Sequence, residues 1–157
     1  MQSTALKGKI MGQTFILLKP DAIERDLVEP ILNYFKQKNV IIQQQLELIA
    51  KEPIILAHYD DVIKRVGDFL APRFIEEFNN KKVIAVLLES HHENLIDLVR
   101  EWIGPTDPAK ASTDTIRGKY ANDSMEASKQ EGRLLRNLIH ASDSFEAFQR
   151  EVSLWFS

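Results

Sequence analysis

The sequence contains no cysteine. Its absence excludes disulfides, thiol chemistry and thiolate metal sites, and it is compatible with a reducing compartment. The sequence also lacks any run approaching the roughly 18 apolar residues of a membrane span, and residues 1–12 lack the apolar core of a signal peptide. We therefore expect a cytoplasmic protein that does not associate with a membrane.

An excess of charge of one sign is also missing. The 20 basic side chains nearly balance the 23 acidic ones, and the net charge is −3. No overall field therefore draws the protein to nucleic acid, and the predicted strands carry no stripe of aromatic and basic residues, so nucleic-acid binding is disfavoured. Any anion that binds must be held by a local cluster.

The common glycine-rich phosphate motifs are absent. Neither G-x-x-x-x-G-K-[ST] nor G-x-G-x-x-G occurs, so a nucleotide would bind without a P-loop or a Rossmann turn. The adjacent His91 and His92 do not suggest a metal site, because neighbours on a helix point to different faces.

A chain of 157 residues fits one compact domain, large enough to bury about 70% of the surface of its unfolded chain. We expect residues 11–157 to form this domain. Met11 stands just before the first clear strand, so residues 1–10 are interpreted as an N-terminal extension, either native or a remnant of cloning.

Apolar patterning predicts alternating strands and helices. We expect strands at 14–18, at 40–42 continuing through 45–49, at 83–88 and at 134–139, and helices at 27–39, 54–62, 69–78, 95–102 and 145–155. Residues 104–128 show no sustained periodicity and are predicted to form a long irregular loop, which in a compact domain tends to be functional or disordered.

The order of these elements indicates an α+β fold. Two β-α-β units in a split pattern favour a four-stranded antiparallel sheet with helices packed on one face, the ferredoxin-like arrangement. No internal repeat or linker suggests a second domain.

One histidine stands out as a candidate nucleophile. An apolar run brings His140 to the start of a helix, and Ser142, Asp143 and Ser144 follow at once. Such a ring is held by rigid structure and is still accessible, and a neutral imidazole is a competent nucleophile near physiological pH. A lone histidine is more often a half-buried core residue, so other residues must support the hypothesis.

Several residues able to bind phosphate lie at element ends or in loops. Each alone has an ordinary explanation as a surface or packing residue, whereas a phosphate site needs such donors to converge. The candidates are Lys19, Tyr59, Arg100, Thr106, Arg117 and Asn137.

Separated segments in a fixed order carry a family resemblance. They are Thr14-Phe15-Ile16-Leu17-Leu18-Lys19-Pro20-Asp21, His58-Tyr59, Gly104-Pro105-Thr106-Asp107-Pro108, Thr115-Ile116-Arg117-Gly118, and Asn137-Leu138-Ile139-His140-Ala141-Ser142-Asp143-Ser144 followed by Glu151 and Trp155-Phe156. On this set the sequence resembles the nucleoside diphosphate kinases, over nearly the whole chain from Gln13.

The resemblance implies an enzyme with a ping-pong mechanism. His140 would take the γ-phosphoryl group of a nucleoside triphosphate, typically ATP, and pass it to a nucleoside diphosphate. The six candidates above would contact phosphates or sugar, with Lys19 also assisting catalysis, and Glu151 with Ser142 would orient the ring. The resemblance further implies Mg²⁺ carried by the nucleotide phosphates and a homo-oligomer, either a tetramer or a hexamer.

The sequence also departs from the family pattern. It is longer near residues 60–69 and at 121–132, and Leu70, next to Phe69, aligns where an aromatic residue normally stacks on the base. Lys119 replaces a usual acidic residue and Ala141 a usual glycine. The alternative is a non-catalytic member of the fold that binds nucleotides or a partner. Because a binding module has no need of a nucleophile oriented by Glu151, the enzyme is favoured.

Overall fold

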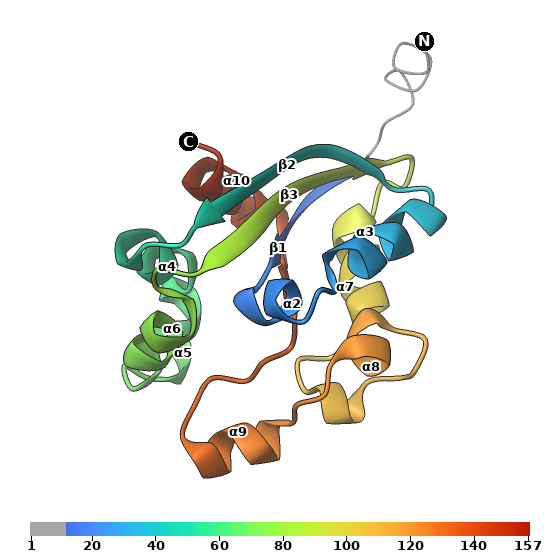
Figure 1. The fold of residues 1–157 in the computed structure, drawn as a ribbon. Coiled ribbons are helices and arrows are strands. Elements are labelled where there is room, and N and C mark those ends of the chain that lie inside the picture. The colour runs from blue at the N-terminus through green and yellow to red at the C-terminus, as the bar shows by residue number, and fades with distance from the viewer. Residues whose placement is uncertain (1–11) are drawn as a thin grey trace.

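The computed structural model describes residues 12–157 (Figure 1). The extension predicted at residues 1–10 lies outside the described residues. None of the helices between residues 12 and 157 combines the length and the apolar character that a membrane crossing needs.

The centre of the described chain is a four-stranded sheet in the order β2-β3-β1-β4 (Figure 1). Each neighbouring pair of strands is antiparallel, as predicted. The strands are β1 (Gly12–Leu18), β2 (Ile41–Ile49), β3 (Lys82–Ser90) and β4 (Ile139–Ala141).

The helices surround this sheet. The described chain forms α2 (Pro20–Glu24), α3 (Val28–Gln37), α4 (Glu52–His58), α5 (Asp60–Val66), α6 (Leu70–Phe78), α7 (Leu95–Ile103), the 3₁₀ helix η1 (Pro108–Lys110), α8 (Ile116–Tyr120), α9 (Met125–Glu131) and α10 (Phe145–Trp155). The longer ones, α3, α6, α7 and α10, follow the predicted apolar spacing. The short α2 was not predicted.

Helices cover both faces of the sheet, so the prediction of helices on one face is wrong. Successive side chains of a strand point to opposite faces. In β1, Ile16 and Leu18 pack in an apolar cluster with α3 and α7, whereas Phe15 and Leu17 pack in a second cluster with α4, α6 and α10. The physical reason is visible in the sequence, because strands buried on both faces form continuous apolar runs.

The segment predicted as an irregular loop contains η1, α8 and most of α9. Each of these short helices begins at a polar cap: the side chains of Asp107, Thr115 and Ser124 accept hydrogen bonds from backbone N–H groups of the first turn. Helices of this length are too short to produce a detectable apolar period.

The last strand was placed too early. The prediction was 134–139, but β4 covers only Ile139–Ala141. The reason is a γ-turn centred on Leu138, which has φ +75°, with Ile139 N–H donating to Asn137 O at 2.9 Å. This rare turn interrupts the extended backbone just before the ladder with β1 begins.

Candidate active site

His140 lies in β4 directly opposite Leu17 of β1. Because paired residues share a face, its side chain joins the face covered by α4, α6 and α10. The ring centroid lies 4.3 Å from that of His58, 6.0 Å from Tyr59 and 6.4 Å from Phe15. The side chain keeps 23% of its surface exposed, so the ring is both held and accessible.

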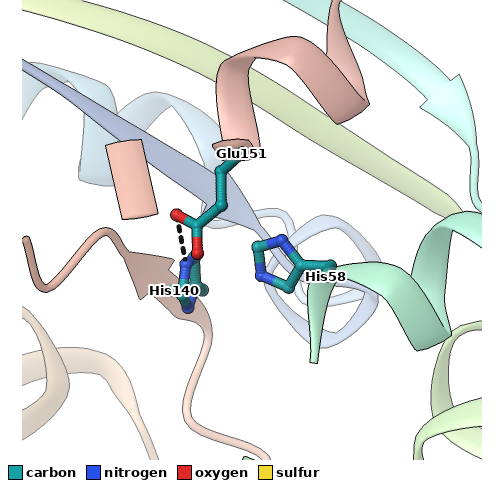
Figure 2. Close-up of side chains that lie close together, drawn as sticks. All are labelled: His58, His140 and Glu151. Carbon is teal, nitrogen blue, oxygen red and sulfur yellow. Dashed lines mark hydrogen bonds and ion pairs between the residues drawn. The ribbon is translucent and has the colours of Figure 1, made fainter. Parts of the chain in front are cut away.

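A buried carboxylate orients the His140 ring. Glu151 Oε1 lies 3.0 Å from His140 Nε2, and Ser142 Oγ donates to the same oxygen at 2.5 Å. A carboxylate only accepts, so the proton of neutral His140 is on Nε2 and Nδ1 keeps a free lone pair. Figure 2 shows this second nitrogen at the end of the ring that faces away from Glu151.

His140 borders two adjoining cavities, of about 550 and 620 Å³, which share Val62, Thr106 and Arg117 as well as His140 in their linings. Lys19, Tyr59, Leu70 and Asn137 line the first, and Arg100 lines the second. The structure therefore brings every residue predicted to bind phosphate or base to the two cavities beside His140. Glu151 and Ser142 contact one another at the Nε2 end of the His140 ring.

Lys19 is held by a short hydrogen-bond chain. Its Nζ donates to Asn137 Oδ1 at 2.8 Å and to Leu135 O at 3.4 Å, and Asn137 Nδ2 donates to Thr106 O at 2.9 Å. Burial lowers the pKa of Lys19 to about 8, against the opposing effect of Asp21. The ammonium has three donor protons, so one is left for a ligand.

Arg117 clamps the backbone around the γ-turn. Its guanidinium donates to the carbonyl oxygens of Asn137 at 3.2 Å, Ile139 at 2.6 Å and Gly104 at 3.0 Å. Burial lowers its pKa to about 10. Arg117 therefore holds the approach to His140 in place and also contributes a cation to both cavities.

Tyr59 contributes a protonated hydroxyl. Its ring stacks on that of Phe74, with the ring centroids 4.0 Å apart and an angle of 14° between the planes. Burial raises the pKa of the phenol above its ordinary value. The side chain borders the first cavity, where a neutral hydroxyl can donate to a phosphate or sugar oxygen.

The first cavity has a positive lining, although one of its cations, Arg133, is paired with Asp123 at 2.7 Å and with Glu131 at 2.8 Å. No Asp or Glu occurs among the described residues that border it, whereas its cationic residues are Lys19, Arg65, Arg73, Arg117, Lys129 and Arg133. Although the protein has a net charge of −3, this surface concentrates positive charge where a polyanion can be stabilised.

The two segments that depart from the family pattern border this same cavity. Val62, Val66 and Phe69 come from the first, and Met125 comes from α9 in the second. Hydrogen bonds hold α9 in place: Met125 N–H donates to Asp107 Oδ1 at 3.1 Å. The sequence contained no signal that these segments, about 60 residues apart, would line the same cavity.

His58 and Asp21 are site residues that the sequence analysis did not assign. His58 is 3% exposed and packs against His140, and Asp21 accepts a hydrogen bond from Leu138 N–H. The available signal was their position, because each belongs to a motif segment and lies within two residues of a predicted site residue, Tyr59 or Lys19.

Ligand atoms of His58, His140 and Glu151 lie within 4.8 Å of one another, a spacing that could suit a metal. The hydrogen bonds argue against one. Trp155 Nε1 donates to His58 Nδ1 at 2.9 Å, and an indole can only donate. The ring proton of His58 is therefore on Nε2, and a protonated nitrogen has no lone pair for a metal.

Comparison with known proteins gives consistent similarities. The family model described as nucleoside diphosphate kinase matches residues 12–157. The chain is 35% identical to a nucleoside diphosphate kinase of Gallus gallus, covering 92% of this chain and 84% of that protein. It is also 35% identical to one of Thermosipho africanus, covering 94% and 90%.

Solved structures show the same similarity. A transition state mimic of the Borrelia burgdorferi nucleoside-diphosphate kinase with bound vanadate and ADP superposes with a TM-score of 0.87 at 28% identity, covering 93% of this chain and 87% of that one. An NDP kinase from Pyrobaculum aerophilum gives a TM-score of 0.82 at 26% identity, covering 94% and 96%.

Proposed function

Because this chain belongs to the nucleoside diphosphate kinase family, and is a nucleoside-diphosphate kinase by function, we propose that His140 Nδ1 carries the phosphoryl group between its substrates. The single observation that most supports this role is the hydrogen bond from His140 Nε2–H to Glu151, because it leaves the lone pair on Nδ1.

In the proposed first half-reaction, Nδ1 attacks the γ-phosphorus of a nucleoside triphosphate. The Nδ1–P bond forms as the bond from phosphorus to the β,γ-bridging oxygen breaks, and the diphosphate leaves with that electron pair. Glu151 accepts the Nε2–H hydrogen bond throughout and stabilises the positive charge that the ring gains. A second nucleoside diphosphate then reverses the step.

The cavity residues supply positioning and charge. Lys19, Arg100 and Arg117 would offset negative charge on the phosphates, and Tyr59, Thr106 and Asn137 would donate to phosphate or sugar oxygens. Leu70 would contact the base from the outer part of the first cavity. These assignments are supported by the position of each residue in the lining of one or both cavities beside His140.

Mg²⁺ is the metal we propose for the reaction. Among the described residues, the first cavity is lined by no carboxylate and the second by two, Glu101 and Asp143. Two carboxylates are too few to enclose the ion, so the residues fit an ion that arrives on the nucleotide phosphates. There it would neutralise part of the phosphate charge. The chain's own cations act on the remaining oxygens.

A labelling experiment tests the phosphohistidine. The protein is mixed with γ-labelled ATP and Mg²⁺ without an acceptor, and we expect acid-labile, alkali-stable label that GDP or UDP discharges. His140→Ala should take up no label and still bind ADP. Label of the same lability in the His140→Ala variant would refute the proposed role. Unlabelled wild-type protein that binds nucleotide would favour the alternative, a binding module.

We also propose a homo-oligomer, either a tetramer or a hexamer. In the described sheet, β2 pairs only with β3, and it exposes Leu46 at 41% and Ile49 at 43%. An exposed edge strand with apolar side chains is a template for association. Light scattering after gel filtration would give the mass, and Leu46→Asp should reduce it.

A cytoplasmic location also stays a prediction, which cell fractionation would test.

A further inference from the structure

The buried ring of His58 has a defined hydrogen-bonding state. Its Nδ1 accepts the indole N–H of Trp155 at 2.9 Å. Because the indole cannot accept, a proton on Nδ1 would face a donor, so the neutral ring carries its proton on Nε2. Burial, and next the electrostatic interaction with His140, lower the pKa of His58 well below its ordinary value, which keeps the ring neutral.

The Nε2–H group of His58 has no hydrogen-bond partner among the described residues. Buried donors of this kind are rare and call for an explanation. Figure 2 shows the ring of His58 beside that of His140, with a nitrogen on the side towards it. The two ring centroids lie 4.3 Å apart with an angle of 76° between the planes. The edge of His58 therefore meets the face of His140, and an N–H group can interact with an aromatic face.

Glu151 alone does not fix the orientation of the nucleophile. A single hydrogen bond at Nε2 holds one end of the His140 ring, but that bond does not oppose rotation of the ring plane about the axis from Cγ to Nε2. A contact on the ring face from a separate element removes this freedom. His58, at the end of α4, provides that contact, and Trp155 of α10 fixes the His58 ring in turn.

We propose that His58 is a positioning residue for phosphoryl transfer: its Nε2–H group, set by Trp155, contacts the face of His140 and keeps Nδ1 directed at the phosphate cavities. This inference rests on the proposed role of His140. Its energetic basis is that the attacking atom must be held close to its line of approach, since small misplacements of a reacting group are costly in rate.

The first test is the half-reaction itself, in which rapid quenching follows labelling of His140 by γ-labelled ATP and Mg²⁺ in the intact chain. His58→Phe keeps a ring but lacks the N–H, and it should lower the labelling rate constant by about 10- to 100-fold while the Kd for ADP changes by less than about twofold. His58→Gln can accept from Trp155 and donate towards His140, so it should recover much of the rate. An unchanged labelling rate in His58→Phe would overturn the inference.

The tautomer and its anchor provide tests that do not depend on the fold of a His58 variant. Two-dimensional ¹H–¹⁵N spectra of wild-type protein should show His58 protonated on Nε2, and protonation on Nδ1 would overturn the inference. Trp155→Phe removes the indole donor and should slow labelling. Trp102→Phe is the matched control, because Trp102 lies near His92 instead, and it should label at the wild-type rate. Equal rates in the two tryptophan variants would also contradict the inference.

These outcomes separate the two hypotheses. If wild-type protein takes no label on His140, the proposed function fails. If wild-type protein is labelled on His140 and His58→Phe is labelled equally fast, only the inference about His58 fails.

Discussion

The carboxylate of Asp21 accepts a hydrogen bond from the backbone N–H of Leu138 at 3.1 Å, joining residues 117 positions apart. Leu138 has φ +75°, a conformation that costs a residue with a side chain about 1–3 kcal/mol. Lys19 N–H also donates to Leu138 O at 2.9 Å. The segment that follows β1 therefore holds both polar groups of the residue at the centre of the γ-turn before His140.

Asp21→Ala should loosen this turn. Removing the acceptor leaves the buried N–H of Leu138 unpaired, so we expect the free energy of unfolding to fall by about 1–3 kcal/mol and kcat to fall more than KM rises. Asp21→Asn keeps an acceptor oxygen and should lose less. Urea denaturation and steady-state kinetics measure both effects. Glu24→Ala, at an exposed site of the same helix, is the control, and equal stability of the two alanine variants would contradict the prediction.

At alkaline pH, the protein should take up a proton on Lys19 when a nucleotide binds. Burial lowers the pKa of Lys19 to about 8 in the free protein, so at pH 9 most of this lysine is neutral. Bound phosphates favour its charged form and raise that pKa. We expect affinity for ADP to fall as the pH rises through 8. At pH 6.5 Lys19 is already charged and should contribute no proton uptake.

Calorimetry of ADP binding in buffers of different ionisation enthalpy measures this uptake. Lys19→Met should abolish it, whereas Lys129→Met, which changes an exposed lysine of the same cavity, should retain it. Proton uptake that persists at pH 9 in Lys19→Met would assign the titration to another group.

Glu151→Gln should reduce activity less severely than His140→Ala. The glutamine oxygen can still accept from His140 Nε2, but the negative charge that stabilises the ring during transfer is lost, so we expect kcat to fall by about 10-fold. Glu151→Ala also removes the acceptor, so its kcat should fall further. Steady-state kinetics would show these changes mainly in kcat. A loss in Glu151→Gln as complete as in His140→Ala would indicate a more direct part for Glu151.

Much of the scaffold could be predicted because its signals are local. The apolar runs at 14–18 and 83–88 are strands β1 and β3, and the periodic segments at 95–102 and 145–155 are helices. The same runs also contained a signal that was missed. A strand with one solvated face alternates, whereas these runs are continuous, and this indicates helices on both faces.

The features missing from the prediction depend on contacts between distant residues. Leu138 has no local reason to adopt a positive φ; Arg117 and Asp21 hold the backbone around it. The ring state of His58 likewise depends on Trp155, 97 positions away. Tertiary contacts override local preference at such sites, and functional sites are where this is expected.

The outer part of the first cavity should determine how strongly the nucleobase is held. Phe69 borders it with 53% of its surface exposed, and Leu70 lies next to it. Base stacking on an aromatic ring is worth about 1–3 kcal/mol, so Phe69→Ala should raise KM for nucleoside diphosphates by about fivefold or more. Leu70→Ala should have a smaller effect, and kcat should change little in either variant.

Phe145 offers a matched control, because it is 59% exposed and lies outside the lining of this cavity; Phe145→Ala should leave KM unchanged. Measuring KM for ADP, GDP, CDP and UDP separates stacking from general damage, since the larger purine faces should lose more than the pyrimidines. A uniform loss for all four in Phe69→Ala would instead indicate that the residue supports α6, and the base would then have to be held by α9, starting with Met125.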